Sequence, residues 1–99
     1  MSDKYILDGK TPKQVDSLEE WACWFETAER HVALDKIGAV TVSTVFLGID
    51  HNFFGEPPLL FETMIFGGPH DQHQTRAATW DEAERQHAEA LVMARAGLH

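Results

Sequence analysis

The sequence predicts an α+β fold, a small antiparallel sheet with two amphipathic helices in the order β(β)-α-β-β-β-α. Apolar residues recur at helical spacing over residues 17–33 and 80–95, and each of these segments opens with a helix-capping pattern. Runs rich in β-branched residues, which favour strands, lie between them. Helices that flank antiparallel strands are typical of a two-layer α+β arrangement. We expect one α+β domain over residues 1–99.

The N-terminal segment predicts a short hairpin. Tyr5–Leu7 is apolar, and Asp8-Gly9 follows it as a two-residue turn signal, because glycine accepts a positive φ angle. The return strand, which extends through Val15, contains Pro12. Since proline cannot donate a ladder hydrogen bond, this strand is expected at a sheet edge.

The first helix is predicted over residues 17–33. Ser17 begins a capping box, in which its hydroxyl accepts a hydrogen bond from the amide of Glu20. Trp24 lies beside the apolar stripe, where it either widens the buried face or forms an exposed contact. The stripe itself consists of Leu18, Trp21, Ala22, Phe25, Ala28 and Val32.

Three strands are predicted to follow. Residues 39–49 and 59–66 are rich in β-branched and aromatic side chains, and Gly-Gly-Pro ends the second segment. A shorter strand over residues 73–78 carries Gln74 and Arg76 on one face. Both faces of the two central strands carry apolar residues, and two helices can cover one face. The other face is therefore expected to meet a second copy of the chain, which predicts a homodimer.

The second helix is predicted over residues 80–95, with Gly97 as its C-cap. Thr79 and Glu82 form a second capping box at its start. Its apolar stripe contains a histidine, which we interpret as a core histidine with one hydrogen-bonded nitrogen. The stripe consists of Trp80, Ala83, His87, Ala90, Leu91 and Ala94.

Composition and charge exclude several classes of function. The net charge is −8 and the eight Lys and Arg residues are scattered, so we expect no direct binding to nucleic acid and none to anionic membranes. No segment is long enough to span a bilayer. Cys23 is the only cysteine, which excludes an intrachain disulfide. Without an apolar N-terminal run no signal peptide is expected, and the cytoplasm is the expected compartment.

Several stretches resemble segments of short accessory proteins from tailed phages and prophages. The most distinctive are "VSTVFLGIDHNF" and "PPLLFETMIFGG", and "YILDGKTP", "EWACWFETAERHVA" and "TWDEAERQHAEA" extend the resemblance over most of the chain. The resemblance implies a small protein of the host cytoplasm that acts against a host or a competing phage. It carries over no catalytic residue and no cofactor.

The loop between the two central strands, residues 50–56, is the candidate binding surface. It combines two aromatic rings with charged groups. Rings supply contact area in an interface, and charged groups supply orientation. Its aspartate is also expected to bond the backbone of its own loop. The candidate binding residues are Asp50, His51, Phe53, Phe54, Glu56, Glu62, Arg76 and Trp24.

Glu62 interrupts the second central apolar segment. If Ile49 faces Leu59, the pairing places Glu62 opposite Phe46 and on one sheet face with Thr44. Burial there would favour the protonated carboxyl, which can serve as a general acid. The simpler alternative is a partly solvated position, or a hydrogen bond to the backbone or a helix end.

These residues leave three functions open. The first is a phage-type binding protein without cofactor or metal, which occupies the surface of a host or competitor protein or sequesters a small ligand, as an inhibitor of host defence would. The second is a small hydrolase or metal-dependent enzyme that uses His51, Glu62, His70 and His73. The third is a structural subunit of a larger assembly. No glycine-rich phosphate loop and no G-x-S-x-G elbow occurs, so we favour binding over catalysis.

Overall fold

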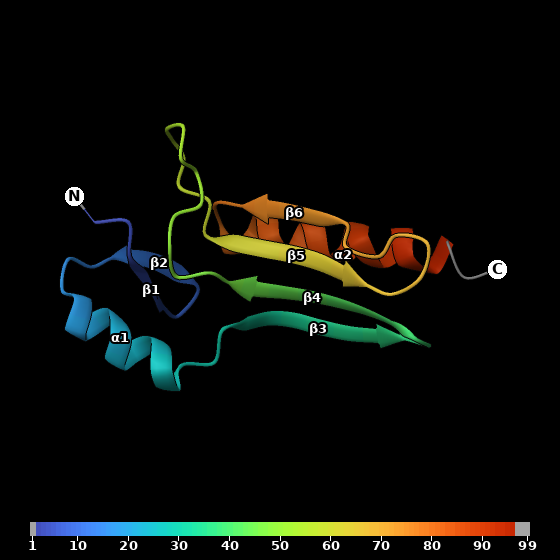
Figure 1. Cartoon of the computed structure of the whole chain (residues 1–99), viewed down its shortest axis with the longest axis horizontal. Helices are drawn as coiled ribbons and strands as arrows, with labels where there is room; N and C mark the ends of the chain where they lie inside the picture. The colour runs from blue at the N-terminus through green and yellow to red at the C-terminus, as the bar shows by residue number, and fades with distance from the viewer. Residues whose placement is uncertain (1, 97–99) are drawn as a thin grey trace.

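Two antiparallel sheets and two helices build the computed structural model, which describes residues 2–96 (Figure 1). This arrangement confirms the predicted α+β class. The structure adds one strand to the predicted order, and the strands divide into a two-stranded and a four-stranded sheet. In chain order the elements are β1 Tyr5–Asp8, β2 Thr11–Gln14, α1 Leu18–Thr27, β3 His31–Ile37, β4 Val40–Phe46, β5 Phe61–Phe66, β6 Gln74–Ala77 and α2 Trp80–Ala96.

Strands β1 and β2 form the predicted N-terminal hairpin. Asp8 pairs with Thr11, so Gly9 and Lys10 make the turn, and Gly9 has a φ angle of 64°. The hairpin is joined to the segment that follows β4, because the amide of Tyr5 donates a 2.8 Å hydrogen bond to the carbonyl of Gly48. This junction links the two sheets.

Helix α1 begins as predicted and ends earlier than predicted. The Ser17 hydroxyl accepts a 3.1 Å hydrogen bond from the Glu20 amide, and the helix ends at Thr27. The prediction of a helix to residue 33 is wrong because residues 31–37 pair along β4 as strand β3. That pairing is made with residues distant in sequence, and it overrides the local helical spacing.

Helix α2 confirms the second helical prediction and covers one face of the four-stranded sheet. Its residues Ala83, His87, Ala90 and Ala94 are buried, in agreement with the predicted stripe. Gly97, the predicted C-cap, lies outside the described residues. The inward side chains of β4 and β5 form two core clusters with α2: Val40, Val42, Ile65, Ala90 and Ala94 in one, and Phe46, Leu60, Phe61, Ala77 and Ala83 in the other.

The pairing of β4 with β5 differs from the predicted register by one residue. Phe46 faces Phe61, and Glu62 faces Val45. Both phenylalanine rings thereby lie on the buried face, whereas the predicted pairing would have placed one of them opposite a carboxylate. Glu62 therefore lies on the face away from α2, and Thr44 lies on the α2 face.

The opposite face of the four-stranded sheet has no helix over it within residues 2–96. The sheet order is β3-β4-β5-β6, and α2 lies behind it in the view of Figure 1. Helix α1 lies beside the small sheet (Figure 1). We call the side of the four-stranded sheet that faces away from α2 the open face.

Candidate functional site

The loop of residues 50–56 is held at its base by two side chains. Asp50 Oδ1 accepts hydrogen bonds from the amides of Asn52 at 2.7 Å and Leu59 at 3.0 Å. Asn52 accepts a 3.1 Å bond from the amide of Phe54 and donates a 2.7 Å bond to the carbonyl of Pro57. The expected role of Asp50, bonding to the backbone of its own loop, is confirmed. These bonds replace the strand ladder that the loop backbone lacks.

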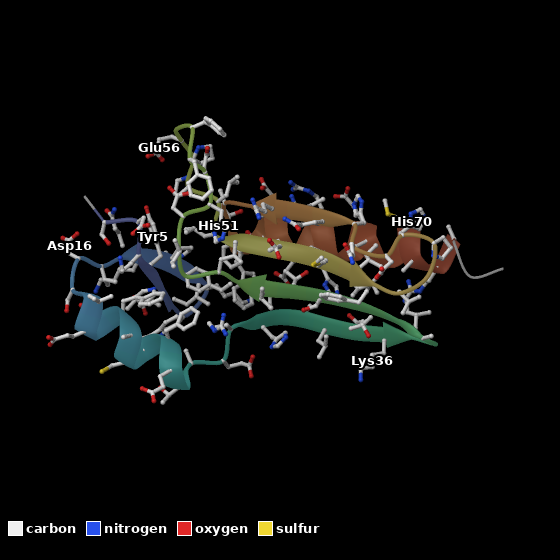
Figure 2. The ribbon with its side chains drawn as sticks, in the orientation of Figure 1. Tyr5, Asp16, Lys36, His51, Glu56 and His70 are labelled. Carbon is white, nitrogen blue, oxygen red and sulfur yellow. The ribbon has the colours of Figure 1, made fainter. Side chains whose placement is uncertain are left out.

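Two phenylalanine rings project from this fixed base. Phe53 is 78% exposed and Phe54 is 99% exposed. The loop extends beyond the sheet, with Glu56 near its tip (Figure 2). Neither ring contributes to the core.

His51 presents one ring nitrogen at this loop. Its Nδ1 lies 2.8 Å from the carbonyl oxygen of Ile49, so this nitrogen carries the proton and donates it. In the neutral ring, Nε2 is then the hydrogen-bond acceptor. The ring centre lies 6.2 Å from that of Phe53, which places an acceptor beside an aromatic surface.

Tyr5 belongs to the same site, although it was not predicted. Burial raises the pKa of Tyr5, and the negative charges of Asp50 and Glu56 raise it further. Figure 2 shows Tyr5 on β1, on the same side of the molecule as the base of the loop. Tyr5 comes close to the loop because its neighbour Lys4 pairs with Ile49, a contact that no local sequence pattern indicates.

Glu62 and Arg76 form a cross-strand ion pair on the open face. The Arg76 Nε atom lies 3.2 Å from Glu62 Oε2, and the Glu62 side chain is partly exposed. Glu62 thus has the partly solvated position that was the simpler of its two predicted environments. The observed register places it there, because it puts Glu62 on the face away from α2. The predicted placement of Arg76 and Gln74 on a shared face is consistent with their pairing to Glu62 and Met64.

Trp24 lies apart from the loop. Its ring packs edge-on against Phe46, with ring centres 5.7 Å apart, and it borders the second core cluster. Of its two predicted roles, the structure places Trp24 in the one that widens the buried face. The remaining predicted residues thus divide between the loop and the open face.

The four residues of the predicted enzyme alternative do not come together. His70 and His73 lie in the turn between β5 and β6, and Figure 2 shows His51 and His70 at opposite ends of the sheet. Among residues 2–96, no three His, Cys, Asp or Glu side chains are grouped so that they would hold a metal ion. His51, Glu62, His70 and His73 therefore do not share one site.

A chain of hydrogen bonds, buried except at Asp35, connects β3, β4, β5 and α2. His87 Nε2 lies 2.8 Å from Asp35 Oδ2, and Nδ1 lies 2.7 Å from the Thr44 hydroxyl. That hydroxyl lies 2.6 Å from the Thr63 hydroxyl. The prediction of a core histidine is correct, but both of its nitrogens are bonded where one was predicted.

The order carboxylate, imidazole, hydroxyl is that of a hydrolase triad, in which the hydroxyl attacks a substrate. Thr44 has no exposed surface, because it lies beneath α2. A nucleophile must reach its substrate, so this arrangement supports packing and not catalysis.

Two shallow hollows of the described surface are small. One, of about 90 Å³, lies between β6 and α2, and the other, of about 260 Å³, lies beside Trp80 and Lys10. Pockets for small ligands typically measure about 300–1,000 Å³. Neither hollow includes a residue of the loop 50–56.

No protein-family model, curated protein or solved structure matches this chain. Neither helix within residues 2–96 has the length and apolar character needed to cross a bilayer.

Proposed function

We propose that this chain is a small phage- or prophage-type accessory protein that binds a partner protein through the loop 50–56, without catalysing a reaction. The exposure of Phe53 and Phe54 on a loop whose base is fixed by hydrogen bonds carries this proposal. Two adjacent exposed rings contribute nothing to this chain's own core. Their burial against a partner would contribute to binding.

The energetic argument favours a protein interface. Aromatic side chains bury about 150–250 Å² each, and such residues are common among those that dominate binding energy. The bonds made by Asp50 and Asn52 order the loop base before binding, which lowers the entropy cost of association. The loop would therefore act as a preordered anchor.

The polar groups of the loop define the kind of partner surface it fits. Phe53 and Phe54 require an apolar depression, and the Nε2 of His51 and the carboxylate of Glu56 require hydrogen-bond or cationic donors at its rim. The two exposed rings side by side in the sequence support a protein partner over a sequestered small molecule. From the resemblance, the partner is a host or competitor protein, and the site of action is the host cytoplasm.

Capture of partners from a host lysate tests this proposal. The immobilised protein should retain a specific protein, identified by mass spectrometry, and solvent extraction of the same sample should show whether a small molecule is retained instead. Phe54→Ala should reduce the captured amount at least tenfold, which corresponds to about 1.4 kcal/mol.

A matched control is available on α1. Leu18 is another exposed apolar residue outside the loop, and Leu18→Ala should leave capture unchanged. A partner retained equally by Phe54→Ala, and lost with Leu18→Ala, would place the binding surface elsewhere. A small molecule recovered without any protein would favour sequestration.

A further inference from the structure

The open face carries exposed and half-buried apolar side chains on three strands. Leu34 is 52% exposed and Phe66 is 46% exposed, while Val45 and Met64 are half-buried. Leu34 faces Ser43, and Ser43 faces Met64 on the next strand, so these side chains lie in one row across the sheet. Single exposed apolar residues are ordinary, but several on one sheet face mark a candidate interaction surface.

The charges of the molecule are distributed so that this face has little net charge. The acidic residues in β3–β6 are Asp35 and Glu62; Asp35 bonds to α2 on the opposite side, and Glu62 is paired with Arg76. Lys36 adds a positive charge at the edge strand, where Figure 2 labels it. The chain as a whole holds sixteen acidic and eight basic residues.

This distribution permits a second copy of the same chain to bind at the open face. Two copies with a net charge of −8 each repel one another, most strongly where acidic surfaces meet. Helix α2 carries four acidic residues against Arg85 and Arg95, so its outer surface keeps a net negative charge that the open face lacks. The open face brings two copies together with the least repulsion.

The sizes of the side chains also suit contact with an identical face. On β4, the small Ser43 lies between Leu34 and the larger Met64, and Thr41 lies between Lys36 and the larger Phe66. When two such faces cross, the large side chains of one copy can lie over the small side chains of the other. A two-fold interface requires this kind of self-complementary patch, and facing sheets pack about 10 Å apart.

We infer that the open face of the four-stranded sheet forms a two-fold dimer interface with the open face of a second copy. The proposal is independent of the loop 50–56, which contributes no residue to this patch. It names the side chains through which the homodimer expected from the sequence would form.

Light scattering coupled to size-exclusion chromatography at micromolar concentration tests the inference. The wild-type protein should elute with twice the chain mass of 11.2 kDa. Leu34→Glu and, separately, Phe66→Glu should elute as single chains, because each introduces two like charges at a two-fold contact. Both positions are exposed, so neither substitution opens the core, and circular dichroism melts should confirm that both variants fold.

Val92→Glu is the matched control, since Val92 is an exposed apolar residue on α2, away from the open face. This variant should retain the mass of two chains. A wild-type mass of 11.2 kDa, a dimer that persists in both open-face variants, or a mass that grows beyond two chains with concentration would each overturn the inference.

Discussion

His87 Nε2 lies 2.8 Å from Asp35 Oδ2, and this contact joins the C-terminal helix to an edge strand 52 residues earlier in the chain. The other ring nitrogen contacts the buried Thr44 hydroxyl, so the imidazole is satisfied on both sides. The neutral ring allows one consistent set of donors: Nε2–H donates to Asp35, Thr44 donates to Nδ1, and Thr63 donates to Thr44.

Replacement of this histidine should destabilise the fold through its neighbours. His87→Leu leaves the buried Thr44 hydroxyl without its acceptor and should lower the free energy of unfolding by about 1–3 kcal/mol. Denaturant unfolding of His87→Leu, Thr44→Val and the double variant should show a coupling of about 0.5–3 kcal/mol. Additive effects would mean that the two residues act independently. Asp35→Asn should cost less than about 1 kcal/mol, because Asp35 is exposed and the amide still accepts a hydrogen bond.

Truncation of a core ring should lower the stability of the protein strongly, whereas truncation of a loop ring should leave it nearly unchanged. Phe61→Ala opens a cavity between β5 and α2 and should cost about 3–5 kcal/mol in unfolding free energy. Trp21→Ala removes a ring stacked on Phe25 and should also destabilise the protein. Phe54→Ala should change stability by less than about 0.5 kcal/mol. A large loss of stability in Phe54→Ala, measured by thermal melting, would show that this ring packs against the chain.

Tyr5 offers a spectroscopic test of the loop base. It is the only tyrosine, so the ultraviolet absorbance change on phenolate formation reports this residue alone. Its titration midpoint should lie above the ordinary pKa of 10.0, because burial and the carboxylates of Asp50 and Glu56 disfavour the phenolate. Glu56→Gln should lower the midpoint. An unchanged midpoint would show that Glu56 does not act on Tyr5.

The raised pKa of Tyr5 also determines how the stability of the protein changes with pH. A folded-state pKa above the unfolded value means that the folded state retains its proton longer. The contribution of Tyr5 is therefore fully present below pH 10.0 and is lost as pH rises through the folded-state pKa. Tyr5→Phe removes this contribution, so its stability should decline less between pH 9 and 11 than that of the wild type.

Substitutions at two glycines distinguish the cost of backbone strain from the cost of a steric clash. Gly9 and Gly67 both have positive φ angles, but a Cβ at Gly9 meets open space, whereas one at Gly67 would lie 2.8 Å from the carbonyl oxygen of Ala39. Gly9→Ala should cost about 1 kcal/mol of stability, and Gly67→Ala distinctly more. Equal losses in thermal melts of the two variants would show that the backbone around Ala39 yields to the added methyl group.

The sequence predicts most of the fold because its strongest signals are local. The capping residues Ser17 and Thr79 fix both helix starts, and each accepts the expected hydrogen bond. Strand β3 was missed because the apolar spacing of α1 continues to Val32, although β4 captures that segment through distant pairing. The register at Glu62 was predicted wrongly for a similar reason. The long loop before β5 allows two registers that differ by one residue, and only the joint burial of the Phe46 and Phe61 rings selects between them.

The candidate site could be predicted only where its contacts are close in sequence. Asp50 bonds to Asn52, two residues away, and the expected cap was found. Tyr5 and Asp35 were missed, because their partners in the loop and in α2 are more than 40 residues distant. The exposure of both Phe53 and Phe54 depends on how the strands before and after the loop pack, which no local pattern indicates.

The hydrogen bonds between residues 3–5 and 48–50 tie the attachment of the loop to the N-terminal hairpin. The Asp50 amide donates 2.9 Å to the carbonyl of Asp3, and the Tyr5 amide donates to Gly48, so the N-terminal strand holds the entry to the loop in place. If the hairpin of β1 and β2 detaches in a local opening, both anchors are released together. The apparent affinity of the loop is then the intrinsic affinity multiplied by the population of the attached state. Substitutions in the small sheet that never touch a partner would thus tune binding by changing this population, and hydrogen exchange at the Tyr5 and Asp50 amides would report the opening.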